Sequence, residues 1–230
     1  PAVVRVFLAL VVCIILCTIF TTIAGFFTAK FKMHPFISTM ANMLVIFGLV
    51  TYSTKGVSFG AIDSTIPNMI IPRINGFPTI ILWAIAAVIV VWFIWNKTTF
   101  GKNMFAVGSN EEAARVSGVN VMATIIGVFM LAGALYGYTG FVEAARLGSS
   151  TATLGLNYEA DAISAAVIGG VSFVGGTGKI SGIVLGVFVL RIIFVALSML
   201  GIDPSMQYII KGGIILAACS LDMRKYLAKK

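Results

Sequence analysis

Charged residues are scarce in this sequence. Only 10% of its 230 residues are Asp, Glu, Lys or Arg, whereas 59% are hydrophobic. In a water-soluble domain, about a quarter of the residues are charged. The mean hydropathy of +1.04 points the same way. This composition excludes a water-soluble enzyme and indicates a protein that resides in a lipid bilayer.

Cysteine and histidine are also rare. Cys13, Cys17 and Cys219 lie inside apolar runs, and His34 is the single histidine. Without a Cys/His cluster of metal-ligand spacing, we expect neither a disulfide framework nor a metal site. The sequence also lacks a nucleophile–base set, and the Gly-rich run at 175–179 fails the phosphate-loop spacing. We therefore expect no catalytic residue and no cofactor held by this chain.

Acidic side chains are outnumbered two to one. Sixteen basic and eight acidic residues give a net charge of +8. In a soluble protein this balance would suggest nucleic acid, but cytoplasmic loops of membrane proteins carry an excess of Lys and Arg for orientation alone. We interpret the charge as an orientation signal and expect no nucleic-acid partner.

Apolar runs dominate the remaining sequence. A helix of about 20 apolar residues crosses a bilayer. A weaker run, interrupted by glycine, is typical of a broken or re-entrant helix packed against protein. The runs are 3–28, 35–52, 79–95, 121–145, 180–200 and 206–221, with 160–174 as the weaker one. The predicted fold is an all-α polytopic helical membrane protein, with about seven spans in a single transmembrane domain over residues 1–230.

The distribution of basic residues predicts the orientation. If the loop 96–120 and the tail 222–230 are cytoplasmic, ten of the sixteen basic residues lie inside. The N-terminus is then outside and the C-terminus inside. An outside start leads us to expect an odd number of further spans upstream. The loop 53–78 falls outside and is either a lid, a docking surface for a soluble partner or an ordinary connector.

Two small-residue patterns predict close helix packing. One consists of Gly133, Gly137 and Gly140, and the other of Gly182 and Gly186. Small residues at this spacing let helix backbones approach each other closely.

The loop 96–120 contains a helix signal. Ser109 and Glu112 are spaced as a capping box, and Gly118 is placed to end the helix. A helix of two turns is marginal in water and needs a docking surface. It is either a turn that re-enters the next span or a knob that fits a cleft on a cytoplasmic protein.

A few acidic residues lie at membrane depth, where ionisable groups usually face a cavity or a partner. Glu143 stands three residues before Arg146, which favours a local pair. Glu159 and Asp161 begin the weaker run, where they contact a transport path or a docked protein, or simply cap the helix.

Two basic residues also lie within predicted spans. Arg191 is in the middle of its span, so we expect a buried partner, with Glu143, Glu159 and Asp161 as candidates. Lys211 is near a span end and is expected to reach the outer interface.

Two motifs resemble one family of membrane proteins. GKNMFAVGSNEEAARVSGVNV at 101–121 resembles the cytoplasmic signature of permease subunits of bacterial ABC importers for ribose, galactose and related monosaccharides. NYEADAISAAVIGGVSFVGGTG at 157–178 looks like the same family's C-terminal hallmark, an acidic pair before a Gly-rich broken helix. The segments 95–103, 208–213 and 221–230 are similar to galactose-transporting members. The resemblance covers nearly the whole chain.

The resemblance implies a function and a set of partners. It implies the translocation subunit of an ATP-driven monosaccharide importer in the bacterial inner membrane, with galactose or methylgalactoside first and ribose or another sugar as alternatives. Members have about ten spans, so the chain looks like the C-terminal two thirds of one. The implied partners are an ABC ATPase that binds ATP–Mg, a periplasmic sugar-binding protein, a second permease copy and the bilayer. A passive pore or an ion-coupled solute carrier is the alternative.

The resemblance also implies site residues. The ATPase-coupling helix would comprise Asn110, Glu111, Glu112, Ala113, Ala114, Arg115, Val116, Ser117, Gly118 and Val119. The translocation path or binding-protein contact would include Tyr136, Glu143, Asn157, Tyr158, Glu159, Asp161 and Arg191.

Overall fold

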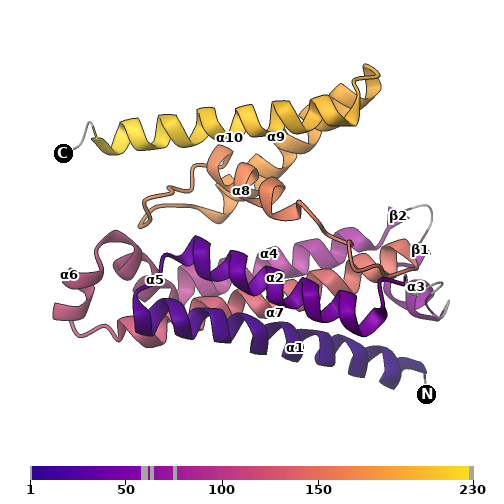
Figure 1. The fold of residues 1–230 in the computed structure, drawn as a ribbon, viewed down its shortest axis with the longest axis horizontal. Coiled ribbons are helices and arrows are strands. Elements are labelled where there is room, and N and C mark those ends of the chain that lie inside the picture. Colours follow the sequence, from indigo (N-terminus) through magenta and orange to yellow (C-terminus); the bar gives the residue numbers. More distant parts are fainter. Residues whose placement is uncertain (1, 58–61, 63–64, 75–76, 228–230) are drawn as a thin grey trace. The chain divides into compact units, whose positions relative to one another are not determined.

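The fold is helical, as predicted (Figure 1). The structure is a computed structural model that describes residues 2–57, 62, 65–74 and 77–227. In chain order the elements are α1 (Ala2–Phe31), α2 (Pro35–Thr54), α3 (Thr65–Ile70), β1 (Arg73–Ile74), β2 (Phe77–Pro78), α4 (Ile80–Lys97), α5 (Thr99–Ser109), α6 (Glu111–Val116), α7 (Val121–Leu147), α8 (Tyr158–Ile168), α9 (Ile180–Met199) and α10 (Pro204–Leu227).

Five of the helices in the described ranges are long and apolar enough to cross a membrane: α1, α2, α4, α7 and α9. Helix α8 has 11 residues. At about 1.5 Å per residue it is too short for a hydrocarbon core of about 30 Å, as expected of the weaker run. Helix α10 has 24 residues and is more polar. The predicted number of about seven spans therefore includes α8 and α10, which do not meet the criterion that the other five meet. The chain is a multi-pass membrane protein.

The chain divides into two compact units. One comprises Pro1–Phe93 and Val119–Leu154, and the other comprises Ile94–Gly118 and Gly155–Lys230. Each unit has its own close helix packing, described in turn below.

In the first unit, α1 packs along α7 through glycine. A Cβ built on Gly137 would lie 2.5 Å from the Cys13 carbonyl oxygen and 2.6 Å from the Ile14 Cα. Gly133 is equally close to the backbone of Thr18. The predicted packing face is thus confirmed at Gly133 and Gly137. It is wrong for Gly140, where a Cβ would have no described neighbour within 4 Å, because that glycine points to another side of α7.

The predicted outer loop 53–78 contains ordered elements. Helix α3 places Ile70 against Phe141 and Ala145 of α7, and all three are buried. Strands β1 and β2 form a short antiparallel hairpin. The Trp83 Nε1–H donates a hydrogen bond of 2.8 Å to the Ile70 carbonyl, which ties α4 to α3. The positions 58–61, 63–64 and 75–76 of this loop lie outside the described residues.

In the second unit, α8 packs against α9 through a second set of glycines. A Cβ on Gly169 would lie 2.6 Å from the carbonyl carbon of Gly182, and a Cβ on Gly186 would lie 2.9 Å from the Gly169 nitrogen. The predicted packing role of Gly182 and Gly186 is confirmed. Backbone contact of this kind makes α8 and α9 a tight helical pair.

The junction between α9 and α10 makes a pH-dependent contribution to stability. The Asp203 carboxylate accepts a hydrogen bond of 2.7 Å from the Ser205 backbone N–H, and hydrogen bonds from Ser205 lower the pKa of Asp203. A carboxyl with a lowered folded-state pKa stabilises the fold above its unfolded pKa of about 3.9, and that contribution is lost as pH falls through the folded value.

We therefore expect Asp203→Asn to lower the unfolding temperature in detergent at neutral pH and to have a vanishing effect below the folded pKa. Unfolding scans of both proteins between neutral and acidic pH measure this difference. A difference that stays constant with pH would contradict the assignment.

Candidate functional site

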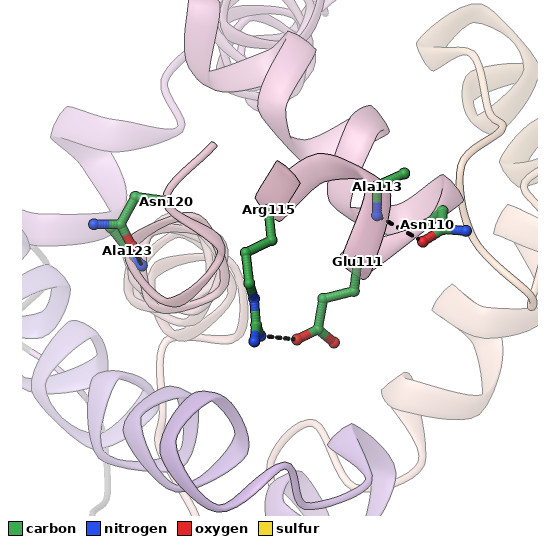
Figure 2. A network of polar contacts seen from close by, with 6 residues as sticks. All are labelled: Asn110, Glu111, Ala113, Arg115, Asn120 and Ala123. Atoms are coloured by element: carbon green, nitrogen blue, oxygen red, sulfur yellow. Dashed lines mark hydrogen bonds and ion pairs between the residues drawn. The ribbon is translucent and has the colours of Figure 1, made fainter. Parts of the chain in front are cut away.

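The loop 96–120 contains the short helix α6 (Glu111–Val116). The Asn110 side-chain oxygen accepts a hydrogen bond of 2.9 Å from the Ala113 backbone N–H (Figure 2). Asn110 has the extended backbone of an N-cap, with φ −162° and ψ 110°. This bond satisfies one of the N–H groups that the first turn leaves free. Asn110 therefore sets the start of α6.

The predicted capping box is wrong. Ser109 is the last residue of α5, so its backbone is helical and cannot take the extended conformation of an N-cap. Glu112 is consequently the second residue of α6 rather than the third. The helix lies within the predicted range Asn110–Val119 but is shorter, because Ser117 caps its C-terminal end.

The end of α6 depends on glycine. Gly118 has φ +82°, the left-handed conformation that ends many helices. Asn120 then caps α7, accepting a hydrogen bond of 3.0 Å from the Ala123 N–H. Capping residues therefore stand at both ends of the connection between α6 and α7, as predicted for Gly118.

The surface of α6 combines charge with an apolar tip. Glu111 and Arg115 form an ion pair of 3.1 Å across one turn, and both side chains are largely exposed. Such a pair contributes little stability, but it orients both charges on one side of the helix (Figure 2). Ala114 is buried, whereas Val116 is 90% exposed. A single exposed apolar side chain is common on protein surfaces, so the 90% exposure shows only that Val116 is accessible to a partner.

Helix α5 is not among the elements predicted from the sequence. Its N-cap is Thr98, whose hydroxyl oxygen accepts a hydrogen bond of 3.1 Å from the Gly101 N–H. Trp95 and Phe105 make an edge-to-face ring contact, with centroids 5.4 Å apart, that joins the end of α4 to α5. The signal was the threonine at 98 followed by an uninterrupted run without proline. The loop is therefore two helices joined at a sharp corner.

The pathway candidates are divided between the two units. Tyr136 and Glu143 lie on α7 in the first unit, and the other five lie in the second unit. Tyr136 is 62% exposed. Glu143 binds Arg146 on the same helix, with the Arg146 Nε donating to its carboxylate at 2.8 Å. The local pair predicted for Glu143 is confirmed.

The start of α8 gathers four of the candidates. Asn157 precedes the helix with φ +70° and makes no side-chain cap, and Tyr158 and Glu159 are exposed. Asp161 forms an ion pair with Lys211 of α10. The Lys211 ammonium also lies 5.2 Å from the ring centre of Phe194 on α9. Asp161 thus joins α8 to α10 beside α9.

One expectation for the basic residues is wrong, namely that of a buried partner for Arg191. The Lys211 side chain is 13% exposed and is held by Asp161, and its expected reach to the outer interface stays a prediction. Arg191 lies on the exposed side of α9, and within the part of the chain that the structure describes it has no ion-pair partner. The acidic candidates Glu143 and Asp161 are engaged by nearer basic residues, which helix depth along the sequence does not reveal.

The Asp161–Lys211 pair makes a direct prediction. We expect Asp161→Asn and Lys211→Met each to lower the unfolding temperature in detergent, because either change leaves one charge without its partner. Because the two residues share one interaction, the double variant should lose less unfolding free energy than the two single variants lose together. The expected coupling free energy is about 0.5–3 kcal/mol. A double-mutant cycle from thermal unfolding measures this coupling. Additive losses would show that the pair contributes nothing.

Comparison with known proteins gives the class. The family of permease components of branched-chain amino acid transport systems matches residues 2–219. The chain belongs to this family, which agrees with the several membrane-spanning helices.

Individual relatives are sugar permeases, as the resemblance in the sequence implied. The galactose/methyl galactoside import permease protein MglC of Treponema pallidum is 44% identical over 100% of this chain and 45% of its own length. MglC of Escherichia coli is 42% identical over 97% of this chain and 69% of its own length. The L-arabinose transport system permease protein AraH of E. coli is 39% identical over 90% of this chain and 63% of its own length. No solved structure gives a significant match.

The chain spans between about half and about two thirds of the length of these curated relatives. Their names concern the import or transport of sugars and do not assign a role to any residue. Any role of α6, or of Asn157, Tyr158, Glu159 and Asp161 at the start of α8, is therefore argued from the geometry described above.

Proposed function

We propose that this chain is the membrane-spanning translocation subunit of an ATP-driven monosaccharide importer and that α6 is its contact with the ATPase. The observation that carries the proposal is the form of α6. Helix α6 is short, is capped by Asn110 and ends at the exposed Val116. It lies between α5 and α7 of a chain that belongs to the permease family. A short, capped helix transmits a push as a rigid body.

Galactose or a methylgalactoside is the proposed cargo. Relatives named as galactose/methyl galactoside permeases are 42–44% identical to this chain, whereas permeases named for arabinose, ribose and allose are 31–39% identical. A neutral sugar requires no charged residue in its path. The polar and aromatic candidates Tyr136, Asn157 and Tyr158 would suffice to line part of it.

The proposal assigns the chemistry to partners. ATP–Mg binds to and is hydrolysed by a cytoplasmic ABC ATPase, whose closure moves the attached spans between inward-open and outward-open states. A periplasmic sugar-binding protein delivers the sugar, and a second permease copy completes the pathway in the bacterial inner membrane. In this proposal the permease contributes no catalytic residue to ATP hydrolysis.

The test is galactose uptake by bacteria that lack their own galactose importers. The cells produce this chain with a galactose-importer ATPase and its binding protein. Uptake that requires all three components and stops on ATP depletion supports the proposal. Uptake that continues after ATP depletion would favour the alternative, a passive pore or an ion-coupled carrier. The Asp161–Lys211 ion pair is a structural argument for that alternative.

A further inference from the structure

The Gly-rich segment that follows α8 touches the end of α5. A Cβ built on Gly108 would lie 2.9 Å from the Gly176 nitrogen, and one built on Gly176 would lie 2.8 Å from the Ser109 Cα. Gly175 is in similar contact with the Gly108 carbonyl group. Two stretches of backbone, more than sixty residues apart in the sequence, therefore meet without intervening side chains.

Glycine is required on both sides of this contact. Gly175 and Gly176 have φ values of +104° and +71°, which place them in the region that side chains disfavour. The backbone of Gly108 is helical, so any residue could adopt its conformation. Glycine is needed there only because a side chain would have no room. Any Cβ there forces the two segments apart by several tenths of an ångström.

The Gly-rich segment is closed by its own hydrogen bonds. The Ser172 N–H donates to the Thr177 carbonyl at 3.2 Å, and the Gly175 N–H donates to the Ser172 carbonyl at 3.3 Å. The Val174 N–H donates to the Ser172 hydroxyl oxygen at 3.2 Å. These bonds close the loop upon itself, so it can transmit a displacement instead of absorbing it.

Each end of the contact continues into a firmly connected element. On one side, the Asn110 N–H donates to the Ala106 carbonyl at 3.1 Å while its side chain caps α6, so one residue ends α5 and begins α6. On the other side, Gly169 and Gly186 hold α8 against α9, and Asp161 on α8 binds Lys211 on α10. All of these residues belong to one compact unit.

We propose that Gly108, Gly175 and Gly176 relay movement of the coupling helix α6 to the α8–α9 pair. The inference rests on the proposed function, because it takes α6 as the place where the ATPase pushes. When α6 moves, the end of α5 presses on the Gly-rich loop, and the loop moves α8, α9 and, through Asp161, α10. The three glycines are positioning residues: they touch neither ATP nor sugar.

The test compares alanine substitutions in contact with alanine substitutions in open space. Gly108→Ala is matched by Gly212→Ala, a helical glycine with nothing within 4 Å of its Cβ. Gly176→Ala, at φ +71°, is matched by Gly170→Ala, at φ +84° in the same loop and also in open space. Each pair carries the same change in helix propensity or backbone strain, so only the contact differs.

Three readouts are measured in proteoliposomes with the full complex. They are ATPase retained on the permease, ATP hydrolysis stimulated by the loaded galactose-binding protein, and galactose uptake. We expect Gly108→Ala and Gly176→Ala to retain the ATPase but to lose about threefold to thirtyfold in uptake per ATP hydrolysed. Both controls should match the wild type.

The double variant Gly108→Ala/Gly176→Ala should be no worse than the more severe single variant, because both disturb one contact. Ser172→Ala, which loosens the loop without adding an atom, should cause a smaller loss in the same direction. Thermal unfolding in detergent shows whether Gly176→Ala folds. If it does not, the relay is tested by Gly108→Ala and Ser172→Ala alone. Uptake per ATP equal to that of the controls in these variants would overturn the relay.

The failure of the relay is distinguishable from the failure of the proposed function. If a charged substitution on α6 releases the ATPase while the glycine variants behave as controls, only the relay is wrong. If the α6 substitution leaves the ATPase bound, the coupling-helix assignment is wrong, and with it the relay that depends on it.

Discussion

Replacing Val116 with aspartate is expected to release the ATPase from the permease and to abolish sugar uptake. Val116 is 90% exposed at the tip of α6, where it would enter an apolar site on the partner. Loss of a buried valine side chain costs about 1.5–3 kcal/mol, and burial of an unpaired carboxylate adds to this. A loss of about 2 kcal/mol or more corresponds to at least about thirtyfold in affinity.

The measurement is co-purification of the ATPase with the tagged permease, followed by uptake. Val57→Asp is the matched control, because Val57 is 66% exposed and lies after α2, in the loop predicted to face outside. The control should retain the ATPase, and this retention is the readout that tests α6. Equal retention of the ATPase by Val116→Asp would disprove the assignment of α6.

Replacing Gly137 with valine is expected to prevent the chain from accumulating in the membrane. A Cβ at this position would lie 2.5 Å from the Cys13 carbonyl oxygen and 2.6 Å from the Ile14 Cα. Both are backbone atoms of α1, so no side-chain rotation relieves the clash. Overpacking of this kind typically costs about 1–3 kcal/mol, and it costs more where a backbone must move.

Gly140→Val separates packing from helix propensity. Gly140 lies on the same helix less than one turn further on, but a Cβ there has no described neighbour within 4 Å. Both variants carry the same β-branched residue in α7. Membrane yield and the unfolding temperature in detergent should fall sharply for Gly137→Val and remain near the wild-type values for Gly140→Val. Similar losses in both would mean that valine harms α7 through its propensity rather than through α1.

Much of the architecture follows from local sequence. Apolar runs of sufficient length place α1, α2, α4, α7 and α9 to within a few residues, because a bilayer requires continuous apolar helices. The shortness of α8 was also predicted from its interrupted run. The position of α6 can be predicted because its start and end signals lie within one short segment. Asn110 caps the helix, and Gly118 has the left-handed conformation just after its end.

Errors arose where one local signal competed with another. Ser109 has the residue type of an N-cap, but α5 continues through it, so Asn110 takes that role. Which of two adjacent candidates caps a helix depends on where the preceding element ends. Helix α5 was not predicted from the sequence, because its start signal, the N-cap Thr98, directly follows a membrane span.

By itself, the sequence determined that the chain is a helical membrane protein with a capped helix between two spans, because hydropathy and capping act over a few residues. Only the tertiary structure decided which distant groups meet. Asp161 binds Lys211 rather than Arg191, Gly137 rather than Gly140 contacts α1, and Gly176 lies against Ser109. Residue types and spacing leave these choices open, because partners on different helices are selected by the rotation and depth at which the helices pack.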